Sequence, residues 1–229
     1  ADIRDYNHLL LSYPRSVSKE MQHLAPQGLV ASLRDHDGVA RLSRQTVVRH
    51  IGAIRTLLNW ARDNDYLQIN PADGIKVSRP KYSPPERLPY DDDDIERIFT
   101  SPLFVGCASA SRRNEPGNKV YRDSRFWLPL LALFTGARLE ELGQLMVSDI
   151  RKEDGIWIVD INANDEGKSL KNRSSVRKVP LHPAMIDIGF TNVKWPQVGW
   201  LFNDLSPSAR TGRRTDSFSK YWGRYARQI

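Results

Sequence analysis

The stretch RFWLPLLALFTGARLEELGQLMVSDI, residues 125–150, decides how the C-terminal part of this 229-residue chain folds. Its apolar run FWLPLLALF (126–134) predicts a buried helix over about 123–134. The Thr-Gly pair at 135–136 ends that helix, because glycine tolerates the left-handed backbone found at helix ends. Apolar residues at helical spacing then predict a second helix over about 138–147.

Arg138 begins this second helix. A charged residue is unexpected there, because Leu142 and Leu145 predict that one face of the helix is buried in the core. Glu141 lies three residues after Arg138, so the two side chains occupy neighbouring helix surface and can form an ion pair. A guanidinium held by a carboxylate keeps its planar fork fixed and can bind a phosphate through two hydrogen bonds. For an isolated Arg-x-x-Glu pattern, a surface ion pair without function is the simpler interpretation.

The rest of the C-terminal part adds two strands and two helices. GIWIVDIN (155–162) alternates and is rich in β-branched residues, and VRKVPL (176–181) is predicted to be its partner strand. The acidic DDDDIERIF (91–99) predicts a helix start, because carboxylates in a first turn complement the helix dipole. DSFSKYWGRYARQI (216–229) predicts a final helix. Its apolar stripe is Phe218, Trp222 and Tyr225, and its basic stripe is Lys220, Arg224 and Arg227.

The N-terminal part is predicted to be helical throughout. Its clearest helix runs from about Ser43, a suitable N-cap, to Asn64. The residues that share its apolar face are Val47, Ile51, Ile54, Leu58 and Ala61. NPADG (70–74) supplies a Pro/Gly stop, and HLLLSYP (8–14) and GLVASLRD (28–35) are candidates for earlier helices.

A proline-rich segment separates these two parts. KVSRPKYSPPERLPY (76–90) holds four prolines and shows little periodicity, which is typical of an extended linker. We therefore expect a helical domain over 1–80, a linker over 81–90 and a second domain over 91–229. The expected fold class is mainly α with a small β-sheet.

Charge points to a polyanionic partner. The formal net charge is +7 and the pI is about 9.6, which favours nucleic acid first and an anionic membrane second. A single cysteine, Cys107, excludes an internal disulfide and fits a reducing cytosol. The longest apolar run is far too short to span a bilayer, so no membrane partner is expected, and the N-terminus lacks the pattern of a signal peptide.

The 125–150 stretch and three others together change how Arg138 is interpreted. The 125–150 stretch resembles the first active-site box of the tyrosine recombinases, the phage integrase family. KSLKNRSSVRKVPLHP (168–183) resembles the β-hairpin that carries the catalytic lysine of that family. Residues 42–74 resemble the last helix of its core-binding domain, and residues 201–229 resemble the segment that leads toward its second active-site box.

The resemblance implies a helical core-binding (SAM-like) domain followed by an α+β tyrosine-recombinase catalytic domain. It implies that Arg138 binds the scissile phosphate, that Glu141 supports Arg138, and that Lys171 acts as general acid toward the departing 5′ oxygen. Lys168 is the alternative for the lysine. A phosphotyrosine intermediate conserves the bond energy, so neither a metal nor another cofactor is expected.

The second box of the family, His-x-x-Arg with a later tyrosine nucleophile, is absent. None of the five histidines is followed by arginine three residues later, and Tyr221 and Tyr225 fit the core better than a nucleophile. His182 fits a structural role. We therefore expect a chain that stops within an incomplete catalytic domain and cannot cleave DNA alone. A DNA-binding remnant or regulator that kept the fold is the alternative function, and an unrelated basic helical protein is a weaker third.

The resemblance also implies double-stranded DNA as partner, a homotetramer on recombination sites, and a cytoplasmic, nucleoid-associated protein of a phage, bacterium or mobile element. Several arginines are candidates for DNA contacts, although a solvated basic face explains any one of them equally well. They are Arg44, Arg49, Arg55 and Arg62 in the N-terminal helix and Arg210, Arg213 and Arg214 in the loop SARTGRRTD.

Overall fold

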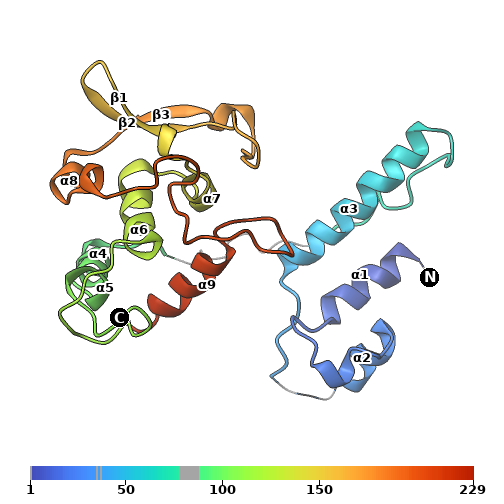
Figure 1. Cartoon of the computed structure of the whole chain (residues 1–229). Coiled ribbons are helices and arrows are strands. Elements are labelled where there is room, and N and C mark those ends of the chain that lie inside the picture. The colour runs from blue at the N-terminus through green and yellow to red at the C-terminus, as the bar shows by residue number, and fades with distance from the viewer. Residues whose placement is uncertain (1, 35, 37, 78–87) are drawn as a thin grey trace. The chain divides into compact units, whose positions relative to one another are not determined.

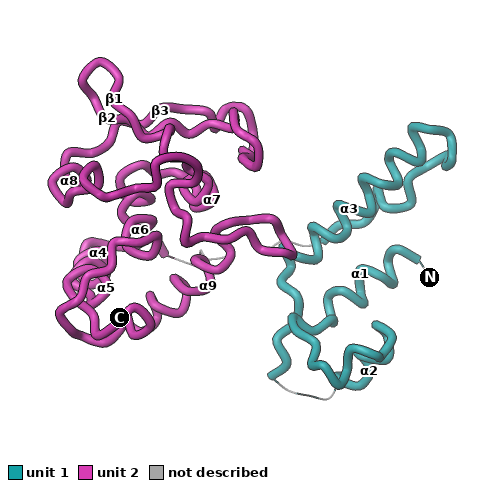
Figure 2. The backbone as a smooth tube through the Cα atoms, in the orientation of Figure 1, with its two compact units in different colours: residues 1–87 teal, residues 88–229 magenta. Residues whose placement is uncertain are grey.

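The computed structural model describes residues 2–34, 36, 38–77 and 88–229. The chain forms two compact units, residues 1–87 and 88–229 (Figure 2). It is mainly helical with one small antiparallel sheet (Figure 1). The predicted linker falls largely outside the described residues. Within the described part of the chain, no helix is both long and apolar enough to cross a membrane.

The described residues of the first unit form three α-helices. They are α1 (Ile3–Ser12), α2 (Pro26–Ser32) and α3 (Arg44–Asp63), with a short 3₁₀ turn at Lys19–Met21 (Figure 1). The predicted helix over 43–64 is confirmed, and the Ser43 hydroxyl accepts a hydrogen bond from the Thr46 amide at its start. The first helix lies earlier than the 8–14 prediction, because Asp2 caps it and Tyr13, just before Pro14, is extended.

A small apolar core holds this unit together. Leu10 of α1 packs with Val47 and Ile51 of α3 and with Ile75, which follows the predicted stop at 70–74. The spacing of Val47 and Ile51 on one helix face is what brings both to the same side.

The second unit surrounds a buried central helix. Its helices are α4 (Asp92–Phe99), α5 (Pro102–Val105), α6 (Ser124–Thr135), α7 (Leu139–Gly143), α8 (Pro183–Asp187) and α9 (Asp216–Tyr225), with 3₁₀ turns at Val147–Asp149, Arg173–Ser175 and Phe190–Asn192. Trp127, Leu128 and Leu131 of α6 are fully buried, which confirms the helix predicted from the apolar run. Gly136 follows α6 in the left-handed region, at φ 62°, and its amide bonds back to Ala132.

The second predicted helix is shorter than expected. The prediction of 138–147 was wrong at its end, since α7 comprises only Leu139–Gly143. Leu145 instead accepts a backbone hydrogen bond from Leu201, and Val147 donates one to Gly199. Pairing with this distant segment takes the backbone groups that would otherwise have extended the helix.

The sheet contains three antiparallel strands in the order β1 (Ile150–Glu153), β2 (Ile156–Ile161) and β3 (Arg177–Pro180). The two predicted strands are confirmed as partners, with Val159 opposite Val179. Strand β1 was not foreseen. It pairs with β2 through a tight turn in which Asp154 and Gly155 both have positive φ.

The last helix packs against the start of the same unit. Phe218 and Tyr225 of α9 are buried, as their stripe predicts. The Tyr225 hydroxyl donates to Ser101 Oγ at 2.7 Å and accepts from the Leu103 amide at 3.1 Å. This tyrosine therefore has a structural role. His182 caps α8 through its Nδ1, and its ring stacks on Phe134. His182 therefore has a structural role as well.

Candidate functional site

Arg138 and Lys171 line the same cleft. Its volume is about 590 Å³, and its walls come from α7 with its cap, from the loop before β3, and from residues 213–219, which include the start of α9. The lining residues are Arg138, Leu139, Glu140, Glu141, Ser169, Leu170, Lys171, Arg213, Thr215, Asp216 and Ser219. Two side chains 33 positions apart in the sequence are thus brought together with a third cation, Arg213.

Arg138 stands at the cap of α7 rather than inside it. Its backbone is extended there, and its amide donates to Glu141 Oε2 at 3.1 Å. Its Nη1 donates to Glu141 Oε1 at 2.6 Å and to Ser175 Oγ at 2.8 Å. The Arg138 side chain is 52% exposed whereas that of Glu141 is 4% exposed, so a buried carboxylate fixes a guanidinium that still faces solvent.

A second arginine shares this carboxylate. Arg177 of β3 donates from Nη2 to Glu141 Oε2 at 3.1 Å and from Nη1 to the Ser175 carbonyl at 2.8 Å. Burial raises the pKa of Glu141, but hydrogen bonds from Arg138 and Arg177 outweigh that effect. The pKa therefore lies below its ordinary value of 4.5, and Glu141 is ionised at neutral pH.

Sequence reasoning missed Arg177, Ser175 and Asn172. Ser175 Oγ donates to Asn172 Oδ1 at 2.6 Å while it accepts from Arg138, so the loop before β3 is joined to the cap of α7. Their position inside KNRSSVRKVPL was the available signal. Residue type alone did not separate them from their neighbours.

The two candidate lysines occupy opposite environments. Lys171 is exposed and forms no hydrogen bond or ion pair with the residues that the structure describes. The side chain of Lys168 is 1% exposed, and its ammonium contacts Asp149 at 2.7 Å and Asp165 at 2.9 Å. Lys171 is therefore the lysine that can reach a ligand in the cleft.

The three arginines of the 206–215 loop also differ. Arg213 is exposed and lines the cleft, and Arg210 is exposed outside its lining. Arg214, predicted to contact DNA, is instead buried. Its guanidinium donates to the carbonyls of Gly143, Phe202 and Leu205, and the ring of Trp200 lies 4.3 Å from Cζ. These carbonyls need donors once they are buried, so Arg214 has a structural role.

The arginines of α3 are similarly mixed. Arg44 and Arg49 are exposed. Arg55, predicted to contact DNA, is half-buried and donates to the carbonyls of Ala72 and Ile75. Arg62 forms ion pairs with two aspartates, at 3.0 Å to Asp63 and 3.7 Å to Asp73. Arg55 therefore holds the 70–75 turn against α3.

Chemically, the cleft suits a phosphodiester. Arg138, Lys171 and Arg213 supply three cations, while Glu141 is committed to two arginines. The second carboxylate of α7, Glu140, accepts hydrogen bonds from the amides of Arg214 and Thr215 and from the Thr215 hydroxyl. The oxygens of both carboxylates are thus occupied by donors of the protein, and Asp216, the third carboxylate of the lining, accepts a hydrogen bond from the Thr211 hydroxyl at 2.5 Å.

Comparison with known proteins yields little. No protein-family model matches the sequence, and no curated protein matches it. Among solved structures, an integrase from mycobacterium phage Brujita matches with a TM-score of 0.37 and 18% sequence identity, over 90% of this chain and 58% of that one. The chain thus spans less than two thirds of that integrase. A likeness this distant carries no argument, so function rests on the residues of the cleft.

Proposed function

We propose that this chain binds duplex DNA and holds one of its phosphodiesters between Arg138 and Lys171, as part of site-specific recombination by a tyrosine recombinase. The observation that carries the proposal is the shared cleft, in which a buried carboxylate fixes one cation and a second cation remains unpaired among the described residues. Residues 1–80 and 91–229 would be its core-binding and catalytic domains.

In this proposal each residue has a role. Arg138 uses Nη1 for Glu141 and Ser175, so Nε and Nη2 can donate to a nonbridging phosphate oxygen. In strand cleavage a tyrosine would give up its phenolic proton to water, and its oxygen would bond to phosphorus while the bond from phosphorus to the 5′ oxygen breaks. Lys171 would donate a proton to that departing oxygen. Fixed cations stabilise the charge that builds on the phosphate.

Cleavage needs groups that this sequence lacks. The tyrosine and the His-x-x-Arg pair of the family would have to accompany the cleft in the active protein. A tetramer on two DNA sites belongs to the same proposal. A regulator that binds DNA without cleaving it is the second candidate, since none of these 229 residues forms a His-x-x-Arg pattern and binding alone does not require one.

DNA binding is tested by fluorescence anisotropy of a labelled duplex over a range of salt concentrations. We expect affinity to fall steeply with salt, and Arg138→Ala and Lys171→Ala each to lower the slope of log K against log salt by about 1. Arg112→Ala is the matched control, because Arg112 forms an exposed ion pair with Glu115 away from the cleft lining. Equal slopes for all three variants would contradict the proposal.

Cleavage is tested with a version of the protein that carries the second box. A nicked duplex should trap it as a covalent phosphotyrosine adduct, and Arg138→Ala should abolish the adduct while leaving the fold intact. If DNA binds and no adduct forms with any nicked duplex, the regulator is the better description.

A further inference from the structure

We infer that Lys168 and Gln144 are positioning residues, which act on a bound phosphate only through Lys171. This inference rests on the proposed function and deepens it. It concerns the loop between β2 and β3, which was predicted only as a long polar connection. The structure shows that this loop is attached to the body of the unit on both sides of Lys171.

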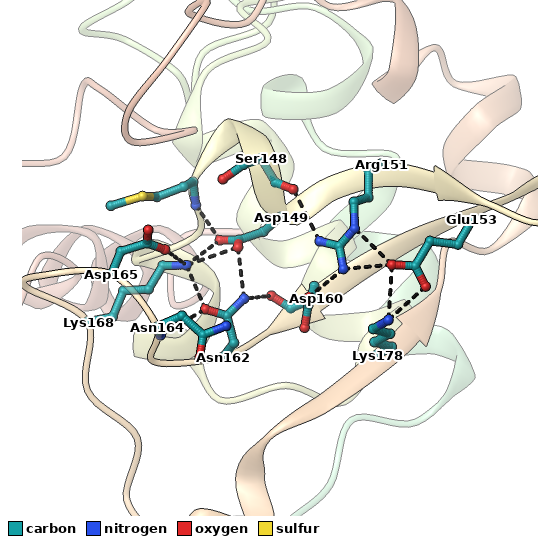
Figure 3. Close-up of polar contacts among 11 residues, drawn as sticks. Ser148, Asp149, Arg151, Glu153, Asp160, Asn162, Asn164, Asp165, Lys168 and Lys178 are labelled. Atoms are coloured by element: carbon teal, nitrogen blue, oxygen red, sulfur yellow. Dashed lines mark hydrogen bonds and ion pairs between the residues drawn. The ribbon is translucent and has the colours of Figure 1, made fainter.

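The first attachment is a buried ammonium. Lys168 Nζ contacts both oxygens of Asp149, at 2.7 and 2.9 Å, and also Asn162 Oδ1 at 3.0 Å and Asp165 (Figure 3). These acceptors use all of its protons. Lys168 therefore cannot reach a phosphate without leaving a buried carboxylate unpaired.

Asp149 is itself held in place. One of its oxygens accepts from the Met146 amide at 2.6 Å, and the other accepts from Asn162 Nδ2 at 2.9 Å. The side chain of Asp149 is 4% exposed. Because Asp149 is held in place, its ion pair with Lys168 also restrains the position of the loop that carries Lys168.

The second attachment follows directly. The Gln144 side chain donates from Nε2 to the Ser169 carbonyl and accepts from the Ser169 amide, both at 2.9 Å. Gln144 is 3% exposed, and Leu170 packs against the apolar core. Three successive loop residues are thus anchored before the chain reaches Lys171.

The far side of Lys171 is anchored as well. Ser175 contacts Arg138, and Asn172 contacts Ser175. Lys171 therefore lies between two anchored segments. The segment before it is held by Gln144 and Asp149, and the segment after it is held by the Arg138 guanidinium. Holding both flanks restricts where its ammonium can go and lowers the entropy lost when it meets a phosphate.

The first experiment needs no DNA. Hydrogen exchange of the Ser169 amide should accelerate about tenfold or more in Lys168→Met, because the loop loses its buried ion pair. Lys178→Met is the matched control, since Lys178 forms an exposed ion pair with Glu153 on the same sheet (Figure 3). If Lys168→Met does not fold, Gln144→Met removes the second attachment while keeping an apolar side chain of similar length. Unchanged exchange at Ser169 in a folded variant would overturn the inference.

The second experiment separates positioning from general stability. Lys168→Met should weaken DNA binding in the wild-type background and have little further effect once Lys171→Ala is present. A merely structural lysine would weaken binding by the same factor in both backgrounds, and that result would overturn the inference. A wild-type chain that does not bind DNA would refute the proposed function, and the exchange measurement would still decide whether Lys168 holds the loop.

Discussion

Arg177 approaches the Glu141 carboxylate to 3.1 Å, on the same oxygen that receives the Arg138 amide. Strand β3 and the cap of α7 are therefore joined through one buried acid. The Arg-x-x-Glu pattern in the sequence suggests a local pair, whereas the structure shows a bridge between distant segments. Such a bridge keeps the Arg138 guanidinium fixed although half of it faces solvent.

Glu141→Gln should destabilise the protein by about 2 kcal/mol, because it leaves two guanidiniums beside a neutral group and Arg138 is partly screened by water. Urea unfolding at pH 7 measures this loss. Glu153→Gln is the control, since Glu153 is a more exposed acid that also faces two cations. An equal loss in both variants would mean that the burial of Glu141 has no special effect.

The same acid gives a pH dependence. The pKa of Glu141 is lowered in the folded protein, so its contribution to stability is present above its ordinary value of 4.5 and is lost as pH falls through the folded value. We expect the unfolding free energy of the wild type to drop more steeply than that of Glu141→Gln below about pH 4.5. Parallel curves for the two proteins in acid would refute this linkage.

Arg213 and Arg214 are adjacent and should behave oppositely. Arg214→Ala should lower the unfolding free energy by about 3 kcal/mol, since three buried carbonyls lose their donor. Arg213→Ala should leave stability unchanged within about 0.5 kcal/mol and weaken DNA binding. Thermal unfolding measures the stability of both variants, and fluorescence anisotropy measures their DNA binding. If Arg214→Ala folds normally and is the variant that binds DNA poorly, then Arg214 and not Arg213 contacts DNA.

Arg49 and Arg55 offer a similar contrast in the first unit. Arg55→Ala should expose the 70–75 turn and speed hydrogen exchange at the Ile75 amide, because two carbonyls lose their donor. Arg49→Ala should leave that exchange unchanged. Equal exchange in the two variants would show that the turn does not depend on Arg55.

Tyr221 carries a buried hydroxyl with no hydrogen-bond partner among the described residues. Burial raises the pKa of Tyr221 to about 12. Folding thus favours the neutral phenol, and this contribution is complete below the ordinary value of 10 and is lost as pH rises through about 12. Tyr221→Phe should gain about 1 kcal/mol and unfold at a higher alkaline pH. In an alkaline titration followed by phenolate absorbance, the ionisation step near pH 12 should be lost in this variant. A variant less stable than the wild type would contradict the prediction, because it would mean that the Tyr221 hydroxyl does form a hydrogen bond.

The sequence predicted the parts of the fold that periodicity controls. The helix from Ser43 and the buried helix before Gly136 were correct because an apolar stripe or run determined each. The end of α7 was wrong because pairing of Leu145 with Leu201 replaced helical bonds, and a local pattern contains no information about a partner 56 residues away.

The candidate site shows the same division. Arg138 and Lys171 could be named from motifs, and both line the cleft. The burial of Lys168, Arg214 and Arg55 could not be foreseen, because a charged residue in a polar sequence is normally exposed. Only the folded chain shows which carbonyls and carboxylates those cations satisfy.

Two consecutive acids of the five-residue helix α7 point to different neighbours. Glu140 holds the backbone at 214–215, and Glu141 holds Arg138 and Arg177. Gly143 allows the Thr215 side chain to approach so closely that an added Cβ would lie 2.1 Å from its methyl group. One short helix thus serves as a common support for the 214–215 backbone and for strand β3, so the separation of the cleft walls depends on α7 itself.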